Sequence, residues 1–475
     1  MFNNIQEFYN TLPVMIVAAG VLIATTIEMY SKKSENILSW FSILVFLSSG
    51  FYSLFTLDAR SVVLQNMLAT GGYVNIFYFI FTFSAAIICF LSIDYLKKYD
   101  AYFGEYYILM QTSVLGMMLM AGAKDLFMIF LGLEVMSVSF YVLAGINRKR
   151  LTATESALKY FLLGAFATGF IVYGIALIYG TAQSTSFEVI TTKFSELSNN
   201  LLFLTGVLLF LIGFSFKIAA FPFHMWVPDV YQGAPSTVAG LFSTAGKAAA
   251  FSAIIVSLFV LFTSGAMRII TPYLSVISVL SMFFGSIVAI AQTNIKRMLA
   301  YSSISHAGYL IIGLAASNTE GIAGIIFYLA AYSFMNLGAF GIVSIIEGKE
   351  ETNLELNSFR GLGIRQPLLA ALLSLFMFSL AGIPPFAGFF GKYYIFIAAI
   401  EAKLTWLAIL GVLSSVISVY FYLRLVVLMY FYDSSEQISI ERSSTGLLAV
   451  FISAIIVVLL GLLPGSLLNL IISYL

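Results

Sequence analysis

The stretch Val74–Leu91 reads VNIFYFIFTFSAAIICFL, and no charged residue interrupts it. A second run, Leu447–Leu463, reads LLAVFISAIIVVLLGLL and has the same character. A helix needs roughly 20 predominantly apolar residues to cross the hydrocarbon core of a bilayer, because each residue adds about 1.5 Å of length. Both runs therefore predict membrane-spanning helices.

The composition of the whole chain agrees with these two runs. Of its 475 residues, 61% are hydrophobic and 9% are charged, whereas soluble domains carry about 25% charged residues. The formal net charge of +1 is too small to indicate a nucleic-acid partner. The single cysteine, Cys89, excludes an internal disulfide and leaves no thiolate set for an iron–sulfur cluster. The first ten residues lack the basic start of a cleaved signal peptide, so we expect the first apolar run to remain as a span.

Apolar runs joined by short polar links predict an all-α membrane protein with about fourteen transmembrane helices. We expect these helices at about residues 12–30, 37–57, 74–93, 105–121, 124–145, 156–179, 201–230 (broken), 236–262, 273–291, 298–316, 322–346, 367–402 (broken), 406–431 and 445–472. The longest polar link, about 347–366, is too short for a soluble domain. Residues 1–475 are therefore expected to form a single polytopic membrane domain.

Alternate links between these helices differ in their basic residues. One set holds Lys32, Lys33, Lys97, Lys98, Arg148, Lys149, Arg150, Lys296, Arg297, Lys349, Arg360, Arg365 and Arg442. The opposite set holds only Arg60, Lys124, Lys193, Arg268 and Lys403. The positive-inside rule places the richer set in the cytoplasm. With an even number of helices, both termini are then expected to lie outside the cytoplasm.

Two of the expected helices are interrupted by proline. Phe216–Pro228 reads FKIAAFPFHMWVP, and Leu380–Lys392 reads LAGIPPFAGFFGK. Proline removes a backbone donor, and a membrane tolerates the freed groups only where protein or water satisfies them. Paired broken helices in the two halves of a chain indicate an internal repeat with the functional site at the breaks. The breaks fall in the seventh and twelfth helices, and this odd offset predicts two inverted five-helix repeats, about 105–262 and 273–431. Two unrelated proline kinks are the alternative.

Several charged residues lie deep within these helices. Glu134 in LFMIFLGLEVMSVSFYVL and Lys247 in VAGLFSTAGKAAAFSAIIV are near mid-bilayer. Lys217 and Lys392 adjoin the two breaks, and Lys159 lies closer to the cytoplasmic end of its helix. Each central charge costs about 2.5–3.5 kcal/mol on insertion scales, so four cost on the order of 10 kcal/mol. An ion pair that fixes helix packing explains Glu134 with one lysine, but one carboxylate cannot neutralise three lysines.

The excess lysines have a chemical use. Removal from water disfavours the ammonium form, so a buried lysine can exchange protons near neutral pH. A row of such groups joined by water would relay protons, and Glu134 would bias the charge of the lysine it pairs with. Lys217, Lys247 and Lys392 are therefore the main relay candidates. Lys159 is a secondary candidate, because it can also snorkel toward the interface.

The two histidines allow more than one interpretation. His306, in YSSISHAGY, falls on the tenth helix, the repeat counterpart of the fifth helix that carries Glu134. Neighbouring Ser and Tyr hydroxyls would let it pass a proton, but a hydrogen-bonded core histidine fits the pattern equally well. His224 lies beside Pro222 and Trp226 at a break, where capping of freed carbonyls is favoured over relay. Two histidines without a Cys or Asp cluster argue against a metal site, and no motif for NAD, flavin or ATP occurs.

Three segments carry a resemblance to a known family. They are GEYYILMQTSVLGMMLMAGAKDLFMIFLGLEVMSVSFYVL (Gly104–Leu143), FKIAAFPFHMWVPDVYQGAPS (Phe216–Ser236) and NIKRMLAYSSISHAGY (Asn294–Tyr309). They resemble the antiporter-like proton-pumping subunits of respiratory complex I, the type I NADH:quinone oxidoreductase, and the likeness covers nearly the whole chain.

This resemblance implies roles for particular residues. In that family a glutamate on the fifth helix faces a lysine on the seventh, which matches Glu134 and Lys217. The family's central lysine on the eighth helix matches Lys247, and its terminal lysine on the twelfth helix matches Lys392. M-type members usually have glutamate at this last position, and L-type members carry a long lateral helix for which the sequence to Leu475 leaves no room. The chain is therefore most similar to the N-type members.

The resemblance also implies partners and a place in the cell. It implies a position in the membrane arm beside an M-type subunit and small membrane subunits, in a bacterial-type inner membrane or an equivalent energy-transducing membrane. FMN, iron–sulfur clusters and quinone are then expected on other subunits, so this chain would be a translocase subunit without a cofactor or redox chemistry of its own. Two alternatives stay open: a subunit of a multi-subunit sodium/proton antiporter or related membrane hydrogenase or dehydrogenase, and a structural membrane scaffold without translocation.

Overall fold

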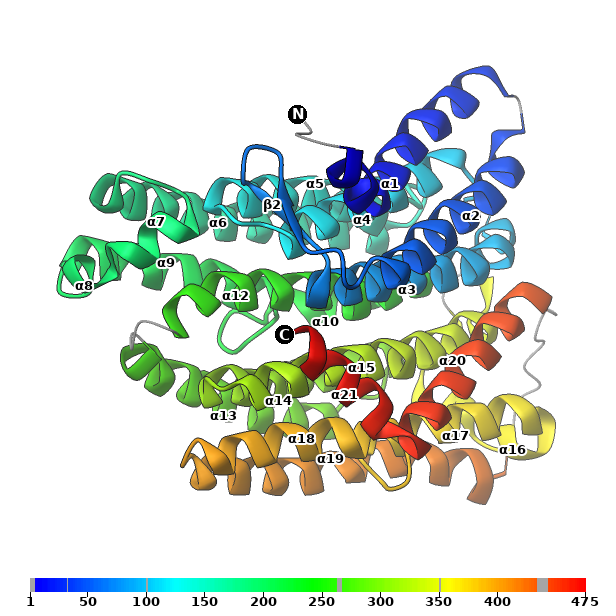
Figure 1. Ribbon diagram of the computed structural model, residues 1–475. Helices are drawn as coiled ribbons and strands as arrows, with labels where there is room; N and C mark the ends of the chain where they lie inside the picture. The colour runs from blue at the N-terminus through cyan, green and yellow to red at the C-terminus, as the bar shows by residue number, and fades with distance from the viewer. Residues whose placement is uncertain (1–4, 32, 100, 263–266, 350–351, 434–442) are drawn as a thin grey trace.

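The computed structural model describes the chain apart from residues 1–4, 32, 100, 263–266, 350–351 and 434–442, and it is a bundle of helices (Figure 1). Lys32 and Arg442, two of the basic residues that bear on orientation, lie outside the described residues. The helices are α1 (Ile5–Tyr30), α2 (Ser34–Phe55), α3 (Gly72–Lys98), α4 (Gly104–Ala121), α5 (Leu126–Ala144), α6 (Leu151–Ala182), α7 (Phe187–Thr192), α8 (Phe194–Leu197), α9 (Leu201–Lys217), α10 (Trp226–Gly233), α11 (Ser236–Leu241), the π-helix η1 (Phe242–Gly246), α12 (Lys247–Phe262), α13 (Met267–Ile290), α14 (Ile295–Ala316), α15 (Thr319–Ile346), the 3₁₀-helix η3 (Leu356–Phe359), α16 (Leu362–Arg365), α17 (Pro367–Ala381), α18 (Ala387–Glu401), α19 (Thr405–Phe431), α20 (Ser444–Leu462) and α21 (Pro464–Tyr474).

The helical membrane architecture expected from the sequence is confirmed. Within the described residues, 11 helical segments are long and apolar enough to cross a membrane. Two shorter apolar helices, α9 and α17, each end at one of the expected breaks. Helix length and composition do not by themselves give fourteen spans, so that number stays a prediction.

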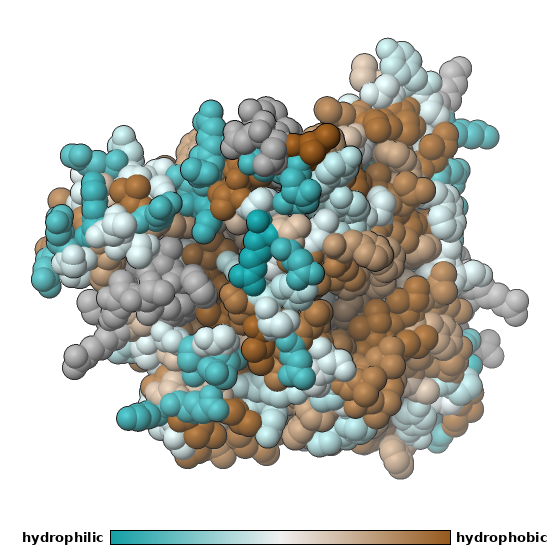
Figure 2. Space-filling model, viewed as in Figure 1, coloured by the Kyte–Doolittle hydropathy of each residue, from teal (hydrophilic) through white to brown (hydrophobic). Residues whose placement is uncertain are grey.

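Burial is graded from the centre of the bundle outward. In the most apolar 18-residue stretches of α15 and of the continuous segment α11–α12, all residues (100%) are buried. In the corresponding stretches of α1 and α6, only 28% of the residues are buried. The outer helices present apolar side chains to their surroundings, such as Phe166 on α6, which is 69% exposed. Apolar residues also cover much of the visible face of the molecule (Figure 2). This surface suits lipid, and the charges in the centre must be accommodated by protein.

Both expected helix breaks are present. α9 ends at Lys217 and α10 begins at Trp226, and α17 ends at Ala381 and α18 begins at Ala387. Each break carries a proline pair or a single proline that cannot donate to the helical ladder. Carbonyls at the end of α9 and α17 therefore lack helical partners and must be satisfied by other groups.

Two further irregularities were not anticipated from the sequence. The expected unbroken helix 445–472 is wrong, because α20 ends at Leu462 and α21 begins at Pro464. Proline is favoured in the first turn of a helix, so it starts a new helix here. The other irregularity is η1, a π-helical turn directly before Lys247. Such turns are rare and often occur at functional sites.

The link after α2 forms a small hairpin, which was not anticipated from the sequence and leaves the all-α class of the fold unchanged. Strands β1 (Ser61–Val63) and β2 (Leu68–Thr70) pair antiparallel, with Ser61 opposite Thr70 (Figure 1). Gly71 follows with a φ of 85°, a conformation that favours glycine, and it leads the chain into α3.

Several helix pairs pack at glycine contacts, and α4–α5 and α13–α14 are two of them. A Cβ added to Gly116 on α4 would lie 2.6 Å from the Gly132 carbonyl oxygen on α5. In the second half, a Cβ added to Gly285 on α13 would lie 2.6 Å from the Ser305 nitrogen on α14. Small residues of this kind let the backbones of membrane helices approach closely. The crossings involve the first two helices of each repeat expected from the sequence.

Candidate proton-transfer site

Lys217 is the last residue of α9 and is 7% exposed. Its Nζ donates to Ser137 Oγ at 2.8 Å and to Tyr141 OH at 3.4 Å, and it lies 5.5 Å from the centre of the Tyr141 ring. Ser137 and Tyr141 both lie on α5, so the ammonium group at the end of α9 contacts the surface of α5. Two hydroxyls and an aromatic face take the place of the water that an exposed ammonium would have.

Glu134 lies on α5 and is half-buried. Its Oε1 accepts a hydrogen bond from Thr168 Oγ1 on α6 at 2.9 Å. Within the part of the chain that the structure describes, no ion pair within 4.0 Å joins Glu134 to Lys217, although the two charges interact electrostatically. The two charges therefore interact without a direct contact, and their role as a coupled pair stays a prediction. Glu134 and Ser137 are three residues apart and share one face of α5, and Ser137 is the residue that accepts from Lys217.

Lys247 is the first residue of α12 and is 3% exposed. Its Nζ donates to both the carbonyl oxygen and Oγ of Ser303 on α14. It also lies 5.4 Å from the centre of the Tyr332 ring on α15. Among the described residues, no carboxylate forms an ion pair with this lysine. These contacts of its Nζ are thus a hydroxyl, a carbonyl and an aromatic face, all of them neutral.

Lys392 lies on α18, just beyond the second break, and is 4% exposed. Its Nζ donates to the carbonyl oxygens of Ala381 at 2.9 Å and Leu380 at 3.2 Å, and to Ser415 Oγ on α19 at 2.9 Å. The two carbonyls belong to the last turn of α17, which the break leaves without helical donors. Lys392 therefore caps the carbonyls that the proline interruption exposes.

His306 lies on α14, is 2% exposed, and interacts electrostatically with both Lys247 and Lys392. Its Nδ1 is 2.5 Å from Tyr328 OH, and its Nε2 is 2.9 Å from Tyr422 OH. Both ring nitrogens thus have hydroxyl partners that can either donate or accept. This geometry is compatible with proton relay and also with a satisfied core histidine, so the two interpretations remain open.

Hydroxyl groups continue the polar contacts on both sides of His306. Ser302, next to the Lys247 partner Ser303, bonds through Oγ to Tyr422 OH. Other contacts run from Ser305 to Ser286 at 2.9 Å, from Ser286 to Ser414 at 3.2 Å, and from Ser414 to Tyr309 OH at 3.3 Å. Lys392 lies over the Tyr309 ring, 5.0 Å from its centre. Buried hydroxyls and one imidazole therefore occupy the interior from Lys247 to Lys392.

An aromatic stack occupies the interior between Lys217 and Lys247. Its members are Phe216, Trp226, Tyr160, Phe242 and Phe140. Successive ring centroids along this series are 5.4, 4.5, 5.5 and 4.4 Å apart. A Cβ added to Gly246, the residue before Lys247, would lie 2.6 Å from the Phe140 ring. The two halves of the lysine row thus differ: one side is largely aromatic and the other is rich in hydroxyls.

His224 does not cap the first break. Its Nδ1 has no hydrogen-bond partner among the described residues, and its ring lies against Phe221 and Phe284 at centroid distances of 5.3 and 4.5 Å. The freed Phe216 carbonyl is instead satisfied by Trp226 Nε1 at 3.0 Å. The expectation that His224 caps this break is therefore wrong, because the larger indole reaches the carbonyl from the start of α10.

Lys159 lies apart from the buried lysines. Its side chain is 42% exposed and forms ion pairs with Glu155 at 2.7 Å and Asp229 at 2.8 Å. Asp229 also pairs with Arg297 at 2.8 Å. This exposed network joins α6, α10 and α14, and its geometry is that of the snorkelling alternative rather than of a buried relay group.

Sequence reasoning missed the two fully buried charged residues Lys296 and Glu347 among the described residues. Lys296 at the start of α14 is 0% exposed, and its Nζ donates to the Ala234 carbonyl oxygen at 2.7 Å. Glu347, which caps the end of α15, is also 0% exposed. Both occur at helix ends, where charges usually reach water, so the only available signal was their position beside the helices that carry the deep lysines.

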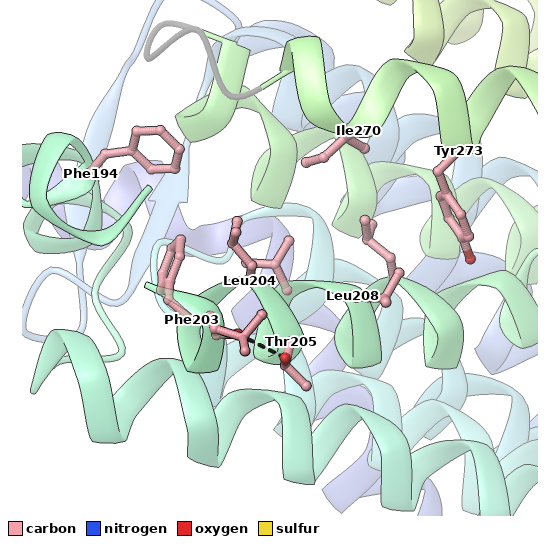
Figure 3. Close-up of a pocket in the computed structure, with 10 residues that line it drawn as sticks. Phe194, Phe203, Leu204, Thr205, Leu208, Ile270 and Tyr273 are labelled. Atoms are coloured by element: carbon pink, nitrogen blue, oxygen red, sulfur yellow. Dashed lines mark hydrogen bonds between the residues drawn. The ribbon is translucent and has the colours of Figure 1, made fainter. Parts of the chain in front are cut away.

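An apolar cavity of about 250 Å³ lies between α9 and α13 (Figure 3). Phe203, Leu204, Leu208, Ile270 and Tyr273 are among the residues that line it. The buried lysines and Glu134 are absent from its lining, so this cavity is not the proton-transfer site.

Comparison with known proteins gives a consistent result. The family model described as NADH:quinone oxidoreductase/Mrp antiporter, TM, matches residues 123–418. NADH-quinone oxidoreductase subunit N 1 of Chloroherpeton thalassium is 42% identical over 468 residues, which cover 98% of each chain. NADH-quinone oxidoreductase subunit N of Trichlorobacter lovleyi is 40% identical over 476 residues and again covers 98% of each chain.

Solved structures share the fold. A chain of respiratory complex I from Thermus thermophilus with bound aureothin is 30% identical, has a TM-score of 0.83, and covers 96% of this chain and 98% of its own length. A chain of the Mrp complex from Dietzia sp. is 19% identical with a TM-score of 0.87, and it covers 98% of this chain and 97% of its own length. The second likeness concerns the fold alone.

Proposed function

The chain belongs to the NADH:quinone oxidoreductase/Mrp antiporter membrane family, and we propose from this premise that it is the N-type, proton-translocating membrane-arm subunit of an NADH-quinone oxidoreductase. Its partners are then the other membrane-arm subunits, including an M-type antiporter-like subunit. Quinone reduction elsewhere in the complex drives proton movement through this chain, which is a translocase subunit. FMN, iron–sulfur clusters and quinone belong to other subunits.

The observation that carries this proposal is the polar interior between Lys247 and Lys392. Two buried lysines, which form no ion pair with a carboxylate of the described residues, flank an imidazole and a set of hydroxyls in hydrogen-bond contact. A scaffold has no use for uncompensated buried cations, which cost several kcal/mol each. A neutral lysine amine, by contrast, can accept a proton at Nζ, and the resulting ammonium can release it to the next group.

The relay works through this chain's own side chains and intervening water. A proton that reaches Lys217 converts its amine to ammonium, which Ser137 and Tyr141 solvate. Glu134 stabilises that charged form from one helical turn away, so a change in the Glu134 environment alters the tendency of Lys217 to release its proton. Lys247 receives the proton in the centre of the bundle, and Lys392 delivers it at the second break.

The topology follows from adding short and broken helices to the 11 long segments. We assign α4 as one span, α9 with α10 as a second, and α17 with α18 as a third, which gives about fourteen spans at the length a bilayer requires. The inverted repeats then cover about 105–262 and 273–431. The glycine crossings of α4 with α5 and of α13 with α14 support this assignment. Both termini lie outside the cytoplasm.

Two other functions make different predictions. A sodium/proton antiporter subunit shares this fold, but relatives that match along 98% of the chain are named subunit N of NADH-quinone oxidoreductase. Purification of the native assembly distinguishes the two: flavin and iron–sulfur subunits accompany a complex I subunit and are absent from an antiporter. A scaffold without translocation is tested by removing the central cation.

We expect Lys247→Ala to leave the complex assembled and to lose most quinone-coupled proton pumping, because the variant removes the central proton acceptor. The matched control is Lys149→Ala, which removes an exposed lysine from the link before α6. Assembly is measured on native gels and pumping in sealed membrane vesicles. Normal pumping by assembled Lys247→Ala complexes would refute the proposed relay.

A further inference from the structure

Glu347 is a buried carboxylate that the proton-transfer site described above does not include. Its side chain is 0% exposed. Oε2 accepts hydrogen bonds from Ser236 Oγ at 2.6 Å and from Tyr95 OH at 3.1 Å. Oε1 has no hydrogen-bond partner among the described residues, and the Arg150 guanidinium is 3.8 Å away. An ionised carboxylate can accept about four hydrogen bonds, so half of this group's capacity is unused.

The groups around Glu347 come from several elements. α3 supplies Tyr95, Lys98 and Tyr99, of which Lys98 Nζ and Tyr99 OH donate to the Glu347 backbone carbonyl. Arg150 precedes α6 and lies over the Tyr99 ring, 4.2 Å from its centre. The carboxylate therefore lies in a predominantly basic and phenolic surrounding at the end of the bundle assigned above to the cytoplasmic side.

Glu347 is connected to the segment that carries the central lysine. Its partner Ser236 is the first residue of α11, which continues through η1 to Lys247. Eleven residues of helix separate the two, or about 16 Å at 1.5 Å per residue. On the facing helix α14, Lys296 donates to the carbonyl oxygen of Ala234, two residues before Ser236. Ser303, the partner of Lys247, follows Lys296 on the same face of α14 after two turns.

We propose that Glu347 is the group that loads protons on the cytoplasmic side and supplies Lys247 along the seam where the segment from Ala234 to Lys247 contacts α14 at both of its ends. This inference rests on the relay function proposed above. A proton from cytoplasmic water binds Oε1, where no existing hydrogen bond has to break, and converts the carboxylate to the neutral acid. The acid then gives up this proton through water in the seam, and the Lys247 amine becomes ammonium. Arg150 stabilises the carboxylate that is restored.

A purely structural role for Glu347 is the competing explanation. In that case the carboxylate stays ionised and serves only to hold the ends of α3, α11 and α15 together. Glutamine keeps the size of the side chain and an oxygen acceptor for Ser236 and Tyr95, but it cannot take up a proton. Aspartate keeps the acid and shortens the side chain. The two substitutions therefore separate proton uptake from packing.

The experiment uses the intact complex with Glu347→Gln, Glu347→Asp and the control Glu355→Gln, which removes an exposed carboxylate on the same side of the bundle. Assembly, vesicle pumping and redox-induced infrared difference spectra are recorded for each. We expect Glu347→Gln to assemble, to lose pumping, and to lose a protonated-carboxyl band present in the wild type. Glu347→Asp should keep part of the pumping and shift the band, and the control should match the wild type.

Several results would overturn the proposal. One is normal pumping by Glu347→Gln while Lys247→Ala fails, which leaves the relay intact but removes Glu347 from it. Another is an unchanged carboxyl band in Glu347→Gln, since a permanently ionised carboxylate gives no such band. If Glu347→Gln does not assemble, the band in Glu347→Asp decides: a shift supports proton uptake and an unshifted band refutes it. Normal pumping by Lys247→Ala would instead refute the relay itself.

Discussion

Replacing Lys392 by arginine tests whether this residue must release a proton. Arginine stays protonated in proteins, so Lys392→Arg keeps the positive charge but cannot act as a relay. We expect the arginine variant to assemble and to pump markedly less than the wild type. A role limited to charge or capping predicts the opposite, because arginine can still donate to the carbonyls at the end of α17.

The structure allows the stability cost of the competing variants to be compared. Lys392→Met leaves the Leu380 and Ala381 carbonyls without this donor, at about 1–3 kcal/mol each. It also removes a buried cation, and the loss of that insertion cost stabilises the variant by about 2.5–3.5 kcal/mol. The net effect is within roughly 4 kcal/mol of zero. Lys392→Arg retains donors but adds volume near Gly382, where a Cβ would already lie 3.1 Å from Lys392 Nζ, and overpacking of this kind costs about 1–3 kcal/mol.

These similar costs make pumping the informative measurement. Complexes containing wild type, Lys392→Arg or Lys392→Met are compared at matched assembly, with NADH oxidation and proton uptake followed in the same vesicles. The relay predicts that both variants pump poorly. Near-normal pumping by Lys392→Arg together with failure of Lys392→Met would refute the reasoning, because the charge alone would then suffice.

Two further predictions concern the first half of the chain. Glu134→Gln combined with Lys217→Met should assemble better than the worse single variant but pump poorly, because removing one member of a coupled buried pair leaves an uncompensated charge; strictly additive losses of assembly would contradict this coupling. Gly116→Ala should lower the free energy of unfolding by about 1–3 kcal/mol and so lower the melting temperature of the complex, since its Cβ would lie 2.6 Å from the α5 backbone. Gly169→Ala is the control, because nothing lies within 4 Å of its Cβ, and equal melting temperatures for the two variants would show that the α4–α5 crossing is not tightly packed.

Helix positions and the two main breaks could be predicted because hydropathy and proline act locally. The break before Pro464 was missed, since proline in the first turn of a helix leaves the apolar pattern uninterrupted. The hairpin at Ser61–Thr70 was missed because its strands are only three residues long. The π-helical turn before Lys247 leaves no mark on the apolar pattern either.

The candidate site was predictable in its residues but not in its contacts. The depth of Lys217, Lys247 and Lys392 follows from counting residues along apolar helices, and all three are buried. The hydrogen bond of Glu134 to Thr168 depends on how α5 and α6 are rotated about their axes, which sequence spacing does not specify. The burial of Glu347 depends on links that fold over the helix ends. A charge in such a link is indistinguishable, in sequence, from one in water.

In the proposed relay, the aromatic stack beside Lys217 and the hydroxyls beyond Lys247 would make the two halves of the interior unequal in how readily they pass protons. Transfer through consecutive sections is limited by the slowest of them, and aromatic rings offer fewer groups that can carry a proton than a line of hydroxyls does. The rate of the proposed relay would then depend on the section where Trp226 packs on Tyr160. Trp226 begins the short helix α10. A neighbouring subunit that displaced α10 would therefore change the rate of proton transfer along the proposed relay without contacting the lysines themselves.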